Sequence, residues 1–98
     1  MDQAPREIAG AKVICFTTIN EHHRPTGNCL QIVEGDVQGP PAGLAICQHE
    51  GKDGYYLFGC NGEWQSVTDT WHQTIEEAKS QAEFEYTGVS TTWQQHAE

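Results

Sequence analysis

Asp69 and His72 are the residues whose types and spacing come closest to a catalytic pair. They lie three residues apart, just before the predicted start of a helix, and Glu76 follows one turn later. Backbone N–H groups at a helix start can hold an anion, and a neutral histidine there can act as a general base. Asp69 as a turn residue and His72 as a partly exposed linker residue explain the same spacing without catalysis. No nucleophile and no Gly-x-Ser-x-Gly motif accompany the pair, so the sequence assigns no catalytic residue.

Cys47 and His49 form a second chemical pair, because residues two apart on a strand share a face. Together they could ligate a soft metal ion, with Cys15, Cys29 or Cys60 from neighbouring strands completing the site. Structural zinc sites usually draw paired ligands from tight turns, and no two cysteines of this chain are close in sequence. We therefore expect buried thiols that pack as small hydrophobic residues, and neither a metal nor a cofactor.

Aromatic residues in the second half of the chain offer a third kind of chemistry, a pocket for a planar or cationic ligand. The candidates are Tyr56, Trp64 and Trp71. We expect such a pocket between the helix and the sheet. Packing in the protein core explains most of these aromatic residues without any ligand.

The elements that must position these residues are organised around one predicted helix, at residues 74–87. Thr74 and Glu77 have the spacing of a capping box at its start, and Gly88 can adopt the left-handed conformation after its end. Spacings of three, four and four define one apolar face, made of Ile75, Ala78, Ala82 and Tyr86. The two alanines in this face allow the helix backbone to approach a sheet closely.

Five segments rich in β-branched and aromatic residues predict strands. They span residues 13–19, 29–34, 43–49, 55–60 and 64–70. A hairpin turn is indicated by Asp53-Gly54. The short connections predict an α+β fold, an antiparallel meander sheet of about five strands with one C-terminal helix packed across one face.

The ends of the chain are predicted less sharply than its middle. Residues 1–98 are expected to form a single domain. Residues 1–12 have no strong pattern and are expected to form a loose arm, with Ile8 as a candidate anchor. Residues 89–95 are expected to be a short extended tail, with Trp93 folded back over apolar surface.

The charge of the chain is strongly negative and uneven. The formal net charge is −9, and residues 63–98 contain seven acidic residues and one basic residue. Such a chain repels phosphate backbones, so we expect no nucleic-acid binding. No apolar run approaches the ~18 residues of a membrane span, and no secretory signal is recognisable. We therefore expect a cytoplasmic protein without membrane contact.

Apolar area that one helix cannot cover favours an interaction module over an enzyme. We expect a non-enzymatic, acidic domain that forms a homo-oligomer or binds a protein partner, with a basic partner favoured by charge. The candidate contact residues are Phe84, Glu76, Glu83 and Trp93. The alternatives are a small-ligand-binding domain with an aromatic pocket, and an enzyme that uses Asp69 and His72.

The stretch 55–93 also carries a resemblance. It contains Tyr-Tyr-Leu-Phe at 55–58, Thr-Asp-Thr-Trp-His at 68–72 and Gln-Ala-Glu-Phe-Glu-Tyr at 81–86. This pattern resembles a group of small bacterial proteins of unassigned activity, some of which travel on integron gene cassettes. The resemblance implies a bacterial origin and a small α+β domain, and it carries over no catalytic residue and no ligand.

Overall fold

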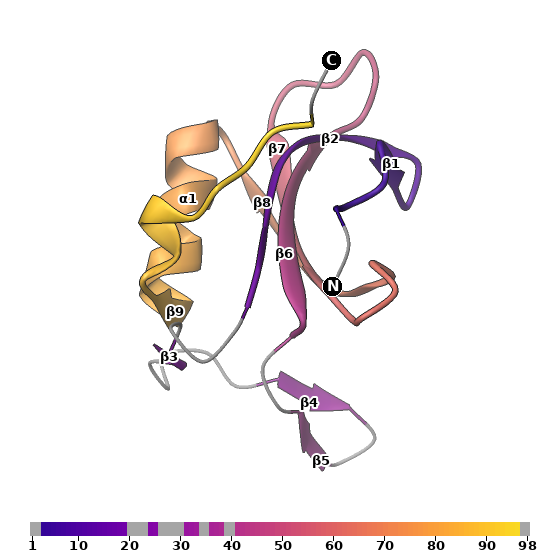
Figure 1. The fold of residues 1–98 in the computed structure, drawn as a ribbon. Coiled ribbons are helices and arrows are strands. Elements are labelled where there is room, and N and C mark those ends of the chain that lie inside the picture. The colour runs from indigo at the N-terminus through magenta and orange to yellow at the C-terminus, as the bar shows by residue number, and fades with distance from the viewer. Residues whose placement is uncertain (1–2, 20–23, 26–30, 34–35, 39–40, 97–98) are drawn as a thin grey trace.

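The computed structural model describes residues 3–19, 24–25, 31–33, 36–38 and 41–96. These residues form the predicted α+β fold, a curled five-stranded antiparallel sheet with one helix packed across a face (Figure 1). No helix in these ranges is long and apolar enough to cross a membrane.

The main sheet has the strand order β1-β2-β6-β7-β8, and every pair of neighbours is antiparallel. Its strands are β1 (Glu7–Ile8), β2 (Ala11–Thr18), β6 (Gly43–Gln48), β7 (Tyr55–Cys60) and β8 (Ser66–His72). The predicted turn at Asp53-Gly54 connects β6 to β7, as expected. Gly54 has a φ angle of 87° there, a left-handed conformation that costs glycine little.

Residues 31–33 of the predicted strand 29–34 do not join the main sheet, contrary to our prediction. They form β4 (Gln31–Val33), which pairs with β5 (Asp36–Gln38) in a separate two-stranded sheet. The remaining residues of the segment lie outside the described ranges. A strand propensity is satisfied by either pairing, so it does not decide which sheet the segment enters.

The fifth place in the main sheet belongs to β1, which comes from the arm that we expected to be loose. Ala9 and Gly10 both have positive φ angles and reverse the chain, so that β1 lies antiparallel to the start of β2. Ile8 is buried, and so is Ala4 before the strand. The arm is therefore packed from Ala4 onward, with Ile8 as the anchor that the sequence suggested.

The helix α1 (Ile75–Glu85) begins as predicted. The Thr74 hydroxyl accepts a hydrogen bond from the Glu77 N–H at 3.0 Å, and Glu77 Oε2 accepts one from the Gln73 N–H at 3.0 Å. The first bond satisfies a backbone donor that a helix start leaves without an intrahelical partner, and the second ties the residue before the N-cap to the first turn. The predicted capping box is confirmed, with Gln73 as the residue whose N–H closes it.

The helix ends two residues earlier than predicted. The following residues form β9 (Tyr86–Thr87), which pairs with β3 (Arg24–Pro25). Gly88, with a φ angle of 100°, starts the 3-10 helix η1 (Val89–Thr91) and does not cap α1. The reason is that Tyr86 is already extended, because a β partner from a distant part of the chain competes with the last helical turn.

The tail after η1 returns to the sheet. Gln94 and Phe16 exchange two backbone hydrogen bonds of 2.8 and 2.9 Å, so the tail pairs with β2 beyond the end of β1. Trp93 is half-buried against the helix-side core, as expected. The tail is thus extended only after η1.

The core has two layers, one on each face of the sheet. On the helix side, Leu44, Ile46 and Leu57 pack against Ala78 and Ala82, which are both buried. The small alanine side chains let α1 approach the sheet closely, as the sequence predicted. The helix contacts β6, β7 and β8.

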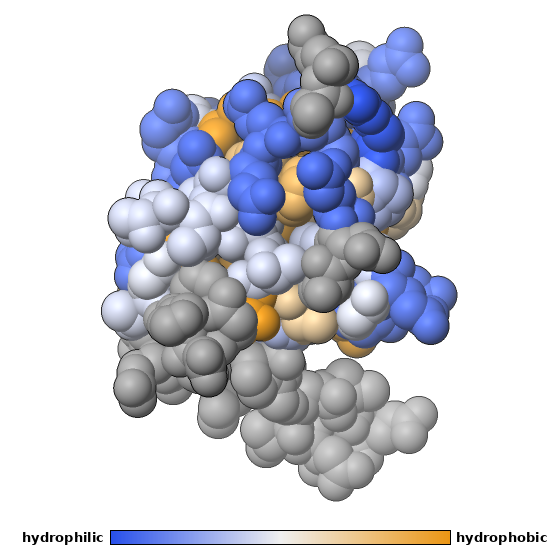
Figure 2. Space-filling view, viewed as in Figure 1, coloured by the Kyte–Doolittle hydropathy of each residue, from blue (hydrophilic) through white to orange (hydrophobic). Residues whose placement is uncertain are grey.

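The second face is also covered over β2, β6 and β7, so much of the apolar area that one helix cannot cover is buried by other segments. Phe16 lies at its centre, with ring centroids 5.7 Å from Trp64 and 5.0 Å from His96. Ile8 and Ala4 belong to the same cluster, and His96 Nε2 donates a hydrogen bond of 2.6 Å to the Ala4 carbonyl. Ala4, Ile8 and His96 therefore help to cover this face beside Phe16. In the view of Figure 2, hydrophilic side chains dominate the described surface and apolar atoms show only between them.

Candidate functional site

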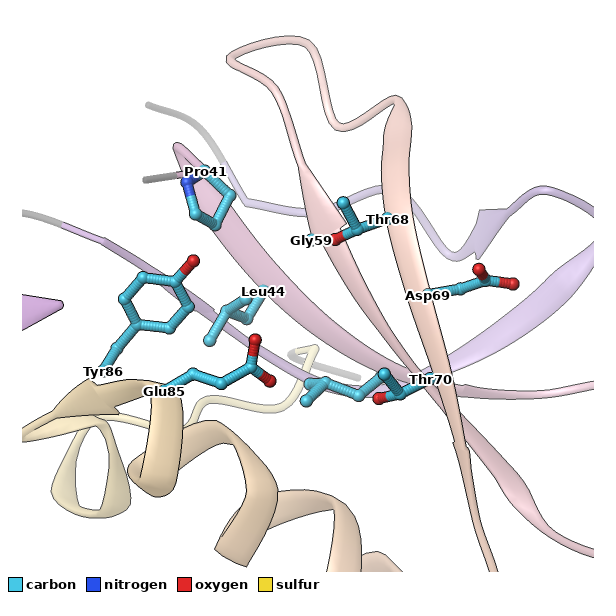
Figure 3. A pocket seen from close by; sticks show the side chains of 9 residues that line it. Pro41, Leu44, Gly59, Thr68, Asp69, Thr70, Glu85 and Tyr86 are labelled. Carbon is cyan, nitrogen blue, oxygen red and sulfur yellow. The ribbon is translucent and has the colours of Figure 1, made fainter. Parts of the chain in front are cut away.

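Asp69 and His72 do not meet in the structure. Both lie on β8 in regular pairing with β7, at positions three apart, so their side chains leave opposite faces of the sheet. The His72 ring forms a 2.8 Å hydrogen bond with the Thr70 hydroxyl, which lies on the helix side. Figure 3 shows the Asp69 carboxylate directed away from that side. The geometry of an acid–base pair is absent here.

Cys47 and His49 do share a face, but only one of them is accessible. Cys47 is fully buried and His49 is half-buried, with its ring edge-on to Tyr56 at 5.5 Å. Burial, followed by the neighbouring thiols of Cys60 and Cys15, raises the pKa of Cys47 to about 12. A metal ion bound to Cys47 would have to displace the proton of this buried thiol. The described residues contain no cluster of three or more His, Cys, Asp or Glu side chains that could hold a metal ion.

The three aromatic ligand candidates separate into two places. Tyr56 and Trp71 are opposite each other on β7 and β8, and together with His49 and Gly54 they line a shallow hollow. The Trp71 ring lies so close to Gly54 that a Cβ atom there would be 2.4 Å from it. Trp64 lies elsewhere, buried in the core of the second face. The expected aromatic pocket between helix and sheet is not formed by these residues.

The four contact candidates also have different environments. Phe84 is 54% exposed and Glu76 is exposed, so both are accessible. Glu83 accepts hydrogen bonds from the N–H groups of Gly88 and Ser90 at 2.9 and 3.0 Å, so its carboxylate holds η1 in place. Trp93 is packed against the core, and its Nε1 is buried without a hydrogen-bond partner among the described residues.

An open edge of the sheet is the first candidate binding site. The edge at β2 is covered by β1 and then by Gln94. The edge at β8 has no strand beside it anywhere in the described ranges. Val67 and Trp71 on β8 are 54% and 53% exposed, and Asp69 between them is exposed as well. We call this strand side, with these three residues, the β8 edge.

Sequence reasoning named Trp71 and Asp69 in other roles and missed Val67. The signal for Val67 was its position in the strand Ser-Val-Thr-Asp-Thr-Trp-His, where Val67 and Trp71 alternate with polar residues. Such alternation normally buries one face. Here β8 is the outermost strand, and the pairing with β7 shifts by one residue between Ser66 and Thr68, so burial does not follow the alternation.

A pocket between the helix end and the sheet is the second candidate site, and we call it the helix–sheet pocket (Figure 3). Its volume is about 130 Å³. Pro41, Leu44 and Leu57 form an apolar wall, and Glu85 and Tyr86 face it from the end of α1. The Glu85 side chain is only 8% exposed, although a carboxylate is costly to bury. The Gln81 amide donates a hydrogen bond of 3.1 Å to its Oε2.

The remaining wall of this pocket comes from β7 and β8. Thr68 and Thr70 lie on the helix side of β8 and line the pocket. Gly59 opposite Thr68 has no Cβ, and one added there would lie 2.4 Å from the Thr68 hydroxyl oxygen. Glycine at this position therefore lets the two strands keep their spacing beside the pocket.

Sequence reasoning missed Glu85 as a pocket residue. Its signal in the sequence was the spacing of seven residues from Ala78, which places Glu85 on the buried stripe of the helix.

Comparison with known proteins adds no relative to this geometry. No family model, no curated protein and no solved structure matches the chain. The resemblance to integron-cassette proteins stays an expectation from the sequence.

Proposed function

We propose that this protein is a non-catalytic interaction module that binds an extended, basic segment of a partner protein along the β8 edge. The observation that carries the proposal is the exposure of Val67, Asp69 and Trp71 on a seven-residue edge strand. An edge strand presents unpaired backbone N–H and C=O groups, which an added strand can pair.

The composition of β8 supports this assignment. Natural edge strands are usually protected from pairing by lysine, proline or short length. Residues 66–72 contain neither lysine nor proline. A bulge near Val67 and the charge of Asp69 are the protecting features of the strand, and the bulge leaves the pairs from Thr68 to His72 regular. A partner strand would therefore find a regular template beside Asp69 and Trp71.

Charge favours a basic partner over a second copy of this chain. If two β8 strands paired with Val67 opposite Trp71, antiparallel geometry would place Asp69 opposite Asp69. Like charges directly opposite in a sheet are destabilising, and each copy carries a net charge of −9. A lysine or arginine opposite Asp69 turns this repulsion into an attraction. The acidic surface would also accelerate the approach of a basic partner.

The cellular setting that we propose for this interaction is the cytoplasm. Cys15, Cys47 and Cys60 are buried free thiols, which fits the reducing compartment expected from the sequence.

A designed strand tests the proposal. The probe is the capped heptapeptide Thr-Val-Thr-Lys-Thr-Val-Thr. A comparison peptide has Glu in place of Lys. We expect the lysine peptide to shift the backbone amide NMR signals of residues 66–72, and the glutamate peptide to bind more weakly. Asp69→Asn should weaken the lysine peptide by roughly three- to fivefold, the scale of one partly exposed ion pair.

The matched control is Glu76→Gln, which removes one negative charge from an exposed position away from the β8 edge. It should leave peptide binding unchanged. Signal shifts confined to other regions, or equal binding of both peptides, would exclude the proposal. Sedimentation of the protein alone tests the alternative that a second copy occupies the β8 edge. A dimer that dissociates on the substitution Trp71→Ser would support this alternative and exclude the proposed partner.

A further inference from the structure

We propose that a hollow on the second face of the sheet binds a neutral, planar heteroaromatic ligand of purine size, stacked on the Trp71 ring. We call this site the aromatic hollow. Its described lining residues are His49, Lys52, Asp53, Gly54, Tyr56 and Trp71. The site uses side chains and not the backbone of β8, so it does not depend on the strand addition proposed for the β8 edge.

The Trp71 ring is both accessible and held in position. The side chain is 53% exposed. A Cβ atom at Gly54 would collide with three atoms of the indole, Cζ2, Cε2 and Nε1. The indole therefore packs directly on the turn between β6 and β7, and glycine leaves the space for it. The turn supports one side of the ring, and the rest is accessible to a ligand.

Tyr56 supplies a second ring whose position is also fixed. It lies opposite Trp71 in the pairing of β7 with β8, so the two side chains share a face of the sheet. Its ring is parallel to that of the buried Phe58, with centroids 5.7 Å apart, and the His49 ring meets it edge-on at 5.5 Å. A ligand therefore meets rings that are already ordered, which lowers the entropic cost of binding.

The rings select a planar, aromatic ligand. Stacked aromatic pairs are more stable than burial of the same apolar area alone would make them. Nucleic-acid bases stack on tryptophan and tyrosine in this way, whichever base is present, because every base has a π face. An aliphatic ligand of the same size lacks this contribution.

The charges of the lining favour a ligand without net charge. Lys52 and Asp53 are both exposed, and their charges are opposite. The net charge of −9 repels an anion, whereas Lys52 beside the rings opposes a cation. An ammonium group donates hydrogen bonds and a carboxylate accepts them. The edge of a purine carries both acceptors and donors, so it can pair with both side chains.

The volume of the aromatic hollow sets the size of the ligand. It is about 410 Å³, compared with about 130 Å³ for the helix–sheet pocket. Sites for small molecules usually have about 300–1,000 Å³, and a cavity of about 150 Å³ accepts the single ring of benzene. The aromatic hollow therefore has room for two fused rings with a substituent. The ligand class is a neutral purine base or nucleoside.

The test uses three probes, each titrated into the wild-type protein near neutral pH while backbone amide NMR signals are followed. Adenosine carries the neutral purine, ribose lacks the rings, and adenosine 5′-monophosphate adds negative charge. We expect saturable shifts with adenosine in residues 49–56 and at Trp71. Ribose should give no saturable shifts. Adenosine 5′-monophosphate should bind at least about threefold more weakly than adenosine, because the acidic protein repels its phosphate.

Three variants locate the stacking interaction. Trp71→Leu keeps an apolar side chain but removes the ring, so it should weaken adenosine binding at least about fivefold. The matched control is Val67→Ala, since Val67 is 54% exposed on the same strand and lies outside the aromatic hollow. It should leave adenosine binding unchanged. Asp69→Asn, which should weaken the lysine peptide at the β8 edge, should also leave adenosine binding unchanged.

Equal binding of adenosine and ribose would overturn the proposal, and so would adenosine binding that Trp71→Leu does not weaken. Tighter binding of adenosine 5′-monophosphate than of adenosine would overturn the assignment of a neutral ligand. If Trp71→Leu does not fold, the three probes on the wild-type protein still decide the question. None of these outcomes affects the β8 edge, whose peptide test depends on Asp69 and on the backbone of residues 66–72.

Discussion

Gly43→Ala tests whether Trp64 seals the second face of the sheet. A Cβ atom at Gly43 would lie 2.7 Å from two carbon atoms of the Trp64 ring and 3.3 Å from the Thr17 carbonyl oxygen. Contacts below 3 Å are not tolerated, so the ring must leave its position against Phe16. Overpacking of this kind costs about 1–3 kcal/mol. For a domain of this size, each kcal/mol lowers the melting temperature by about 4–8 °C.

A double-mutant cycle isolates the contact. Trp64→Ala alone should cost about 3–5 kcal/mol, because it removes a large buried side chain. In that background the new Cβ at Gly43 meets no ring, and only the contact with Thr17 is left. The cost of Gly43→Ala should therefore fall by about 1–2 kcal/mol, which appears as a coupling energy between the two sites.

Urea denaturation followed by circular dichroism gives the four free energies of unfolding. If Trp64→Ala does not fold, Trp64→Leu replaces it, since leucine lacks the ring atoms that approach Gly43. Equal costs of Gly43→Ala in both backgrounds, within about 0.3 kcal/mol, would refute the reasoning. Trp64 would then not cover this face, and the face would return as a candidate for partner binding.

Two further predictions concern carboxylate and thiol groups. Glu83→Ala should lower the free energy of unfolding by about 1.5–3 kcal/mol because its carboxylate accepts two backbone hydrogen bonds. The exposed control Glu76→Ala should change it by less than about 0.5 kcal/mol, and similar costs in urea denaturation would contradict the structural role of Glu83. Burial raises the pKa of Cys47 and Cys60 to about 12, whereas an unfolded thiol ionises near pH 9, so the unfolded chain loses protons that the folded chain retains. The free energy of unfolding should therefore fall from about pH 9 upward, by about 1.4 kcal/mol per pH unit for each thiol. A Cys60→Ala variant whose free energy of unfolding falls with pH as steeply as that of the wild-type protein would disprove this.

The start of α1 is the part of the structure that the sequence predicts best. The bonds between Thr74, Glu77 and Gln73 join residues within one helical turn, so their spacing in sequence is also their spacing in space. The hairpin between β6 and β7 is predictable for the same reason, because a turn of a few residues fixes which strands pair.

The prediction failed where two distant segments competed for one place. β1 has only two residues and no strand pattern, yet it replaces the segment 29–34 in the main sheet. Its position depends on burial of Ile8 in the core of the second face, which residues far along the chain complete. The end of α1 shows the same effect, because β9 pairs with β3 sixty residues earlier.

The candidate sites were also predicted well where they depend on neighbouring residues and poorly where they depend on distant segments. The prediction ended the last strand at residue 70, and this is why Asp69 and His72 seemed able to approach each other across a turn. In the structure β8 continues through His72, and alternation sends the two side chains to opposite faces. A pocket lies between helix and sheet, but Glu85 and Tyr86 line it, and the predicted residues Tyr56, Trp64 and Trp71 do not.

The sequence by itself determined the α+β class, the capped helix with its alanine seam, the β6–β7 hairpin and the acidic charge. Only the tertiary structure decided that the second face is covered over β2, β6 and β7, that β8 is the open edge, and that Glu85 lies buried beside a pocket. The physical reason is that propensity, capping and turn formation act over a few residues, whereas burial depends on which distant segments meet.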